Sequence, residues 1–368
     1  MLRIVRQAAL ASALTLFAVG VCGCTAHGGV PSTTEASRQK PAVPDGGLLL
    51  QGAGATFPSL LYKTWFSSYQ KEHPASVITY EAVGSGEGIR RFIRSHVKEE
   101  EQVDFGASDA AMRDDEIAKV TGGAVLLPVT AGSVALAYNL PGVNELKLSR
   151  EAYAGIFMGR IKNWNDARIT KTNPGVKIPN LTITTVVRQD GSGTTFAFTK
   201  HLDAISNDWR NSYGPATLVN WPGNSMRATG NDGVAGRIKV STGSIGYVGY
   251  EFARRIGLKI AVLENRAGKF VSPSVTSSTA AFADVEVPDN MRLYVPDPKR
   301  PDAYPIVTLT WILLYNNYAD GKKAKALQDL FRWCLEDGQK YAADLGYVPL
   351  PPNVVARSQV ALDKLGFD

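Results

Sequence analysis

The chain has 368 residues, of which 44% are hydrophobic and 20% charged, with a mean hydropathy of -0.10. This composition excludes a disordered chain and a polytopic membrane protein, and the length predicts two globular lobes of ordinary size. The formal net charge is +6, or 6 − 2 = +4 without Arg3 and Arg6; the excess is mild and scattered, so no nucleic-acid partner is expected.

The first 23 residues have the pattern of a secretory signal peptide. Arg3 and Arg6 give a positive start, and Ala8 to Val21 is an apolar run of 14 residues. A helix that crosses a membrane needs about 20 apolar residues, so this run fits a signal peptide better than an anchor. We therefore predict that residues 1–23 are removed and that the protein is extracytoplasmic.

Cys24 is predicted to carry a lipid anchor. The stretch Val21-Cys22-Gly23-Cys24 resembles the lipobox of bacterial lipoproteins, which implies cleavage after Gly23 and a diacylglyceryl group on Cys24. Cys22 fits less well, because Val21 would then stand where a small residue is needed. The alternative is an ordinary signal peptide with chance cysteines, which also implies export. Residues 24–47, rich in Gly, Pro, Ser and Thr, are predicted to be the anchor and a flexible tether.

The folded body is predicted to begin at Leu48 with alternating strands, glycine-rich turns and helices. In parallel α/β sheets built from such alternation, ligands bind at the carboxyl ends of the strands. The predicted elements are a strand at 48–50 before Gly52-Ala53-Gly54-Ala55, a helix opened by Thr56-Phe57-Pro58 with Thr56 as its N-cap, a strand at 77–80, a turn into a helix at 84–88, and a strand running into a loop at 103–109.

A second α/β unit is predicted to follow. Its loop at 188–195 enters a helix at 196–202, and two helices end the chain. Cys334 lies on an apolar helical face there and is predicted to be a small core residue. If Cys24 carries lipid, no intramolecular disulfide is expected. The predicted strands of this part are Val134 to Tyr138, Ile183 to Val187, Ser244 to Val248 and Ile306 to Leu314.

Two predicted helix starts, Thr56-Phe57 and Ser192-Gly193-Thr194, suit an oxyanion. A helix start offers unpaired N–H groups and the positive end of the helix dipole, and Arg188 adds a guanidinium that Asp190 can orient. Singly, each motif is weak. The 191–194 turn lacks the lysine of a phosphate-binding P-loop, and Pro58 stands where a dinucleotide fingerprint needs its third glycine.

Together, the motifs closely resemble the phosphate-binding receptor of the phosphate-specific ABC transporter. The resemblance extends along nearly the whole mature body. It is carried by Gly-Ala-Gly-Ala-Thr-Phe-Pro at 52–58, Gly-Ser-Gly at 84–86, Asp-Phe-Gly-Ala-Ser-Asp at 104–109 and Arg-Gln-Asp-Gly-Ser-Gly-Thr at 188–194, with further landmarks at 159–166, 230–233, 245–248 and 346–351.

This resemblance implies an α/β fold of the two-lobe type II periplasmic-binding-protein class, with phosphate held between the lobes. Residues 48–130 plus 304–368 would form the first lobe and residues 131–303 the second, with two crossing strands as the hinge. The implied partners are inorganic phosphate, the transmembrane permease subunits of an ABC importer, and the membrane through the lipid anchor. A monomer is expected, with no enzyme activity, no cofactor and no metal.

The resemblance also implies the ligand contacts, and Asp109 is the unusual one among them. A carboxylate can accept the proton that phosphate still carries at neutral pH, whereas sulfate carries none and would meet Asp109 unpaired at a cost of several kcal/mol. The implied contacts are the N–H groups of Thr56, Phe57, Ser85, Gly193 and Thr194, the hydroxyls of Thr56, Ser85, Ser192 and Thr194, and the side chains of Asp109 and Arg188, with Asp190 behind Arg188.

One departure from the family pattern and three alternatives stay open. Many relatives have a second serine after Ser85, where this chain has Gly86 followed by Glu87, so one donor is expected to be missing beside an added carboxylate. The alternatives are a receptor for another oxyanion, an exported phosphatase, and a surface protein for sensing or adhesion. Asp109 disfavours a receptor for another oxyanion. The four histidines are scattered without metal-binding spacing, which disfavours a phosphatase.

Overall fold

The computed structural model describes residues 41–367. The predicted signal peptide, Cys24 and most of the predicted tether lie outside the described residues. From Ala42 onward the chain forms one compact unit, which begins with an exposed, irregular stretch at 42–46. No helix within the described part of the chain is both long enough and apolar enough to cross a membrane.

The first lobe is built on three parallel strands: β1 (Leu48–Gly54), β2 (Ser76–Ala82) and β3 (Phe105–Ser108). Strand β1 lies between the other two, and Gly54 pairs with both Ala82 and Ala107. The carboxyl ends of the strands therefore meet at one edge, where β1 leads to helix α1 (Ser59–Glu72) and β2 to helix α2 (Ser85–Ile93). The predicted alternation is confirmed, except that the motif at 52–54 is part of β1 and not of a turn.

The second lobe repeats this arrangement. Strand β6 (Thr184–Arg188) pairs in parallel with β7 (Ser225–Ala228) and β8 (Ser244–Gly249). Helix α6 (Gly193–Ile205) follows β6, and helix α8 (Gly230–Val240) follows β7. The ends of β6 and β7 thus present two helix N-termini at one edge of the sheet.

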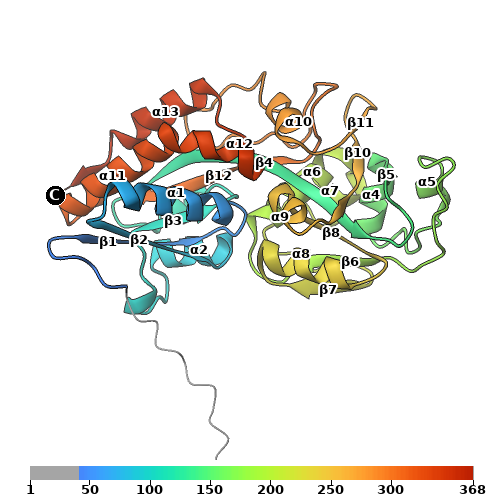
Figure 1. Cartoon of the computed structure of the whole chain (residues 1–368), viewed down its shortest axis with the longest axis horizontal. Coiled ribbons are helices and arrows are strands. Elements are labelled where there is room, and N and C mark those ends of the chain that lie inside the picture. Colours follow the sequence, from blue (N-terminus) through green and yellow to red (C-terminus); the bar gives the residue numbers. More distant parts are fainter. Residues whose placement is uncertain (1–40, 368) are drawn as a thin grey trace, which may run out of the picture. The chain divides into compact units, whose positions relative to one another are not determined.

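Two long strands connect the lobes. Strand β4 (Ala124–Asn139) pairs antiparallel with β12 (Val307–Tyr315) along its first part and with β8 along its last part, while β12 also pairs antiparallel with β3 (Figure 1). The expected parallel sheet is therefore corrected to a mixed sheet: the strands within each lobe run parallel, whereas β4 and β12 run antiparallel to each other and to the lobe strands beside them. The order is β2-β1-β3-β12-β4-β8-β6-β7, with β9 (Lys259–Ile260) on β4.

Each lobe has its own hydrophobic core. The first core gathers Trp65, Phe105 and Trp311, and the second gathers Trp164 and Phe198. Strand β4 contributes to both, since its residues up to 131 pack in the first core and those from 134 in the second. Side chains from 281 to 293 also pack in the first core. The exact lobe boundaries remain a prediction.

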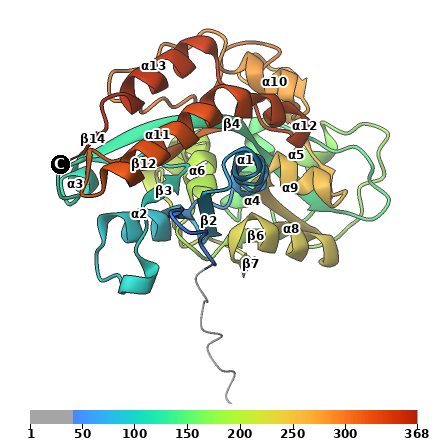
Figure 2. The same cartoon turned by 60° about the vertical axis from the view of Figure 1, so that its left-hand side comes forward.

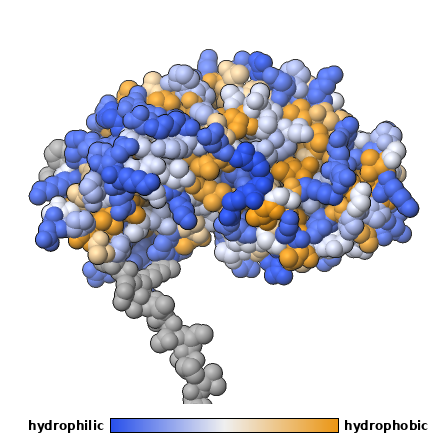
Figure 3. All heavy atoms as spheres, viewed as in Figure 1, coloured by the Kyte–Doolittle hydropathy of each residue, from blue (hydrophilic) through white to orange (hydrophobic). Residues whose placement is uncertain are grey.

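The remaining elements cover the sheet and its edges. Helices α11 (Gly321–Leu335) and α13 (Pro352–Leu362) lie side by side over the first lobe (Figure 2). Cys334 on α11 is a free, fully buried thiol, which confirms its predicted core role. Hydrophilic side chains spread widely over the face seen in Figure 3, with apolar ones interspersed. These elements are α3 (Asp114–Ile117), α4 (Arg150–Phe157), α5 (Ala167–Thr170), α7 (Asn207–Ser212), α9 (Tyr250–Arg255), α10 (Val275–Ala280), α11 (Gly321–Leu335), α12 (Ala342–Leu345), α13 (Pro352–Leu362), β5 (Lys147–Leu148), β10 (Val262–Glu264), β11 (Phe270–Val271), β13 (Asn317–Tyr318) and β14 (Gly366–Phe367).

Candidate functional site

The loop between β1 and α1 brings Thr56 and Phe57 to the edge shared by the strands. Both are buried, and within the described residues neither donates its backbone N–H to another group. The prediction that Thr56 caps α1 is wrong: the helix begins at Ser59, with Pro58 in the cap position and no side-chain cap. The Thr56 hydroxyl instead accepts hydrogen bonds from Asn231 of the second lobe.

Ser85 and Asp109 follow β2 and β3, the two strands that flank β1, and they contact each other. Ser85 is the first residue of α2, after Gly84 in a left-handed conformation with φ 97. Its Oγ accepts a hydrogen bond from the backbone N–H of Asp109 at 3.2 Å. Both residues are 1% exposed. The strand ends of the first lobe therefore place a hydroxyl and a carboxyl together in a dry environment.

The pKa of the Asp109 carboxyl lies close to neutral pH. Burial raises its pKa from 3.8 to about 7, although hydrogen bonds with Thr310 and Thr194 and the charge of Arg188 act in the opposite direction. Its Oδ1 atom is buried and has no hydrogen-bond partner among the described residues. A buried polar atom without a partner is costly, so Oδ1 is suited to a group that brings its own proton.

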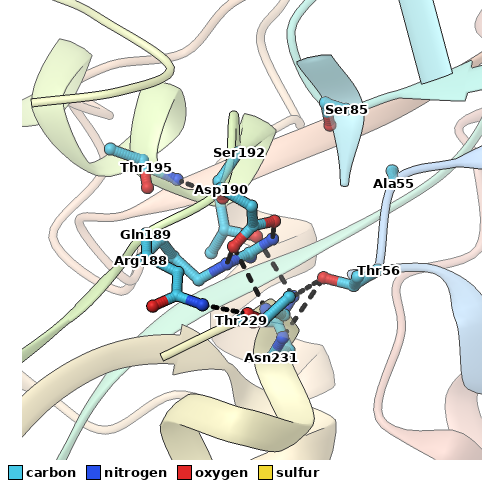
Figure 4. A network of polar contacts seen from close by, with 12 residues as sticks. Ala55, Thr56, Ser85, Arg188, Gln189, Asp190, Ser192, Thr195, Thr229 and Asn231 are labelled. Atoms are coloured by element: carbon cyan, nitrogen blue, oxygen red, sulfur yellow. Dashed lines mark hydrogen bonds and ion pairs between the residues drawn. The ribbon is translucent and has the colours of Figure 1, made fainter. Parts of the chain in front are cut away.

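Arg188 enters from the end of β6 and is 2% exposed. Its Nε donates to Asp190 Oδ1 at 2.7 Å and its Nη2 to Asp190 Oδ2, whereas Nη1 is buried without a partner within the described chain (Figure 4). Burial alone would raise the pKa of Asp190, but the hydrogen bond and charge of Arg188 outweigh it and lower that pKa. Asp190 therefore stays ionised and holds one side of the guanidinium, which leaves Nη1 for an anion.

The N-terminus of α6 completes the second-lobe side of the site. Ser192 caps the helix by accepting a hydrogen bond from Thr195 N–H at 3.0 Å. The first N–H groups of a helix have no partner within it, so those of Gly193 and Thr194 point outward. A Cβ on Gly193 would lie 2.5 Å from Asp109 Cβ and 2.6 Å from Ser85 Oγ, so only glycine lets the helix approach the first lobe this closely.

The two lobes also meet backbone to backbone beside this site. Gly86 N–H donates to the Gly191 carbonyl at 2.9 Å, and a Cβ on Gly86 would lie 3.1 Å from Gly191 Cα. The departure at Gly86 therefore removes a side chain where the lobes touch. The neighbouring Glu87 carboxylate is paired with Arg90 and Arg91, and the hydrogen bond from Arg90 lowers its pKa to about 2. Its charge is thus offset by two guanidinium groups.

Asn231, the second residue of α8, was missed as a site residue. In the sequence it lies within the 230–233 landmark, and an asparagine after a glycine carries no distinctive signal of its own. Its Nδ2 donates to Thr56 Oγ1 at 2.9 Å and to Thr194 Oγ1 at 3.2 Å, and its Oδ1 accepts from Gly249 N–H at 2.9 Å. Asn231 therefore joins predicted contact residues of both lobes.

Tyr247 contacts the backbone of Arg188 and the side chain of Thr195, and it was also missed as a site residue. Its hydroxyl accepts a hydrogen bond from Arg188 N–H at 3.1 Å and lies 2.8 Å from Thr195 Oγ1. Phe57 is fixed from the other lobe, where its carbonyl accepts a hydrogen bond from Tyr347 at 2.7 Å. These contacts hold the backbone that carries the predicted ligand contacts.

The described residues contain no group of three or more His, Cys, Asp or Glu side chains arranged to hold a metal ion. His201 is buried on α6, where its Nε2 lies 2.9 Å from the Tyr153 hydroxyl, and burial lowers its pKa to about 4. His73 stacks on Tyr69 at the end of α1. Neither lies beside the predicted contact residues, and His27 is outside the described residues.

The geometry as a whole defines a class of protein. Two lobes joined by crossing strands present helix N-termini, hydroxyls and one guanidinium to a common point, together with one carboxyl that has a free acceptor atom. Such a site can bind a small anion, and the residues described contain no cluster of three or more His, Cys, Asp or Glu side chains that could hold a catalytic metal ion. This is the architecture of a two-lobe binding protein for a small oxyanion.

Comparisons with known proteins agree with this class. The profile of the PBP superfamily domain matches residues 30–337. The chain is 36% identical over 314 residues to the phosphate-binding protein PstS of Pasteurella multocida strain Pm70, covering 84% of this chain and 88% of that protein. It is 37% identical over 310 residues to the protein of the same name from Xylella fastidiosa strain Temecula1, covering 83% and 82%.

A solved structure is similar as well. The high-affinity periplasmic phosphate-binding protein PfluDING, solved with bound phosphate, superposes with a TM-score of 0.73 at 24% identity, covering 85% of this chain and 93% of that one. This similarity confirms the predicted two-lobe fold. The chain belongs to the PBP superfamily and, within it, to the family of the phosphate-binding proteins PstS.

Proposed function

We propose that this protein captures inorganic phosphate between its two lobes and delivers it to an ABC importer. The proposal rests on two buried atoms that have no hydrogen-bond partner among the described residues, Arg188 Nη1 and Asp109 Oδ1. The first needs a ligand that accepts a hydrogen bond, and the second is best satisfied by a ligand that donates one. Phosphate at neutral pH does both, because it is an anion that keeps a proton.

Backbone and hydroxyl donors would supply most of the attraction. The proposed donors are the N–H groups of Thr56, Phe57, Ser85, Gly193 and Thr194, together with the hydroxyls of Thr56, Ser85, Ser192 and Thr194. Hydrogen bonds that involve a charged group each contribute roughly 1.5–3 kcal/mol. Several of them reach about −8 kcal/mol, which corresponds to micromolar binding, after the cost of closing the lobes.

Asp109 would provide selectivity. Sulfate has the size and shape of phosphate but no proton at neutral pH, so it would leave Oδ1 facing an oxyanion without a hydrogen bond. A buried site that requires a hydrogen bond rejects a ligand that cannot complete it far more strongly than a difference in size could. The same requirement would disfavour molybdate.

The cellular setting of the proposal follows from the family and the leader sequence. The protein would act outside the cytoplasm as a monomer, held to a membrane by the lipid on Cys24, and would pass phosphate to the permease subunits of the importer. It would bind and release its ligand without chemical change.

Calorimetric titration of the mature protein with phosphate and with sulfate tests the proposal. We expect phosphate to bind with a dissociation constant of about micromolar or lower and sulfate to compete poorly. A dissociation constant for phosphate above about 100 µM, or equal competition by sulfate, would contradict it. Release of phosphate from an ester by metal-supplemented protein would favour an enzyme instead.

A further inference from the structure

Asn231 is buried at the N-terminus of α8 with every polar atom of its side chain engaged. It is 1% exposed. One hydrogen of Nδ2 is directed to Thr56 Oγ1 at 2.9 Å (Figure 4). The other is directed to Thr194 Oγ1 at 3.2 Å, and Oδ1 accepts from Gly249 N–H at 2.9 Å. A single amide group therefore touches one hydroxyl from each lobe.

The orientation of this amide follows from its third partner. A backbone N–H can only donate, so the atom that faces Gly249 must be the oxygen of the Asn231 side chain. The NH₂ group then faces the two threonines. Rotating the amide by half a turn would place two donors against each other at Gly249, so the hydrogen-bond pattern selects one orientation.

This orientation determines what the Thr56 hydroxyl can do. A hydroxyl has one hydrogen to donate and two lone pairs that accept. Thr56 Oγ1 accepts from Asn231 Nδ2 at 2.9 Å and from the Asn231 backbone N–H at 3.2 Å, which occupies both lone pairs. Its hydrogen is therefore left to donate to a further group, and the hydroxyl cannot accept from one.

We propose that Asn231 is a positioning residue that makes Thr56 a one-way donor to the bound anion and so confines the proton of the anion to the Asp109 side. This inference rests on the proposed phosphate function. An oxygen that carries a proton gains little from a hydroxyl that can only donate, whereas an unprotonated oxygen is a good acceptor. Asp109 Oδ1 offers an acceptor for the protonated oxygen.

The hydrogen bonds between Asn231 and Thr56 also couple the orientation of the Thr56 hydroxyl to closure of the lobes. Thr56 belongs to the first lobe, and Asn231 to the second, so their two hydrogen bonds exist only when the lobes are in contact. Gly230 N–H on the same helix donates to Asp190 Oδ1 at 3.2 Å. The start of α8 thus fixes both the hydroxyl of Thr56 and the carboxylate that orients Arg188.

A double-mutant cycle tests this role. Asn231→Ala, Thr56→Val, which removes the hydroxyl while keeping the shape, and the double variant are titrated calorimetrically with inorganic phosphate. We expect Asn231→Ala alone to weaken binding roughly 10- to 100-fold, because it removes hydrogen bonds that orient the donor. In the Thr56→Val background the same change should weaken binding clearly less than in the wild type, because the hydrogen bond from Asn231 to the Thr194 hydroxyl is then the only ligand-side contact that it removes.

Ser85 provides the matched control. Its hydroxyl is also a proposed ligand contact but bonds to Asp109 N–H and not to Asn231. In a parallel cycle with Ser85→Ala, we expect Asn231→Ala to have its full effect in both backgrounds. Thermal unfolding of each variant verifies that it is folded, and Asn231→Ser, whose hydroxyl is too short to reach both threonines, replaces Asn231→Ala if that variant does not fold.

The outcomes separate the two proposals. An effect of Asn231→Ala that is as large in the Thr56→Val background as in the wild type, or no effect in the wild type, would overturn the role of Asn231 while leaving phosphate binding intact. A wild-type protein that binds no phosphate would instead overturn the proposed function, and this inference with it.

Discussion

At the scale of single residues, Asp109 and Arg188 require opposite groups of a ligand: Asp109 Oδ1 needs a hydrogen-bond donor and Arg188 Nη1 needs an acceptor. Arg188 is held on one side by Asp190, while burial brings the pKa of Asp109 to about 7. Both residues were predicted from family motifs. Their unpartnered atoms were not predictable, because burial and the absence of a partner depend on how the lobes pack and not on the local sequence.

The exchange Asp109→Asn tests the selectivity argument. The amide can donate to an oxyanion that has no proton, so we expect phosphate to bind at least about tenfold more weakly and the preference for phosphate over sulfate to shrink by about 100-fold or more. Competition calorimetry with both anions measures these changes. Asp115→Asn, on an exposed surface carboxylate, is the control and should leave both affinities unchanged. Unchanged selectivity in Asp109→Asn would contradict the argument.

The raised pKa of Asp109 also predicts a dependence of stability on pH. Because its folded pKa of about 7 exceeds the ordinary value of 3.8, the contribution of Asp109 to ligand-free stability is fully present below about pH 4 and is lost as the pH rises through about 7. The loss amounts to at most about 1.4 kcal/mol for each pH unit. Denaturant unfolding of the wild type and Asp109→Asn between pH 4 and pH 8 measures it. If the difference in unfolding free energy between the wild type and Asp109→Asn does not change with pH, the predicted pH dependence is wrong.

At the scale of elements, the N-terminus of α6 depends on a small residue where it meets the first lobe. Gly193→Ala should weaken phosphate binding by about 100-fold or more, because its Cβ would meet Asp109 and Ser85 at 2.5 and 2.6 Å and hold the lobes apart. Calorimetry gives the affinity, and thermal unfolding shows whether the fold persists. Gly236→Ala is the matched control, since a Cβ there, also in a helix, meets nothing within 4 Å. Equal phosphate affinity in the two variants would argue against close approach at Gly193.

The elements themselves were largely predictable from local sequence, and their partners were not. The strand at β1 and the helix start at Ser85 follow from apolar runs and glycine-rich turns. By contrast, the pairing of β4 with β12 joins segments that are far apart in the sequence, and neither segment carries a signal for strand direction. Thr56 was assigned as a helix cap because its type suits that role, but contacts from the second lobe take its hydroxyl instead. Asn231 was overlooked for the same reason.

At the scale of the whole molecule, the described structure has its lobes in contact at Gly86 and Gly191 and at Thr56 and Asn231. A ligand that binds only this closed arrangement stabilises it by mass action. We expect phosphate at about 100 times its dissociation constant to add about 2.7 kcal/mol and to raise the unfolding temperature by about 5 °C. Differential scanning calorimetry with sulfate at the same concentration and ionic strength is the comparison. Equal shifts with both anions would indicate a nonspecific salt effect.

The central claim is that phosphate is held between Arg188 and Asp109, and a crystal structure of the mature protein grown with phosphate tests it most directly. The account predicts density for one tetrahedral anion within hydrogen-bond distance of Arg188 Nη1 and Asp109 Oδ1, with further contacts to Thr56 and Ser85. Closed lobes with the anion elsewhere, or an anion that contacts Arg188 while Asp109 turns away, would contradict it.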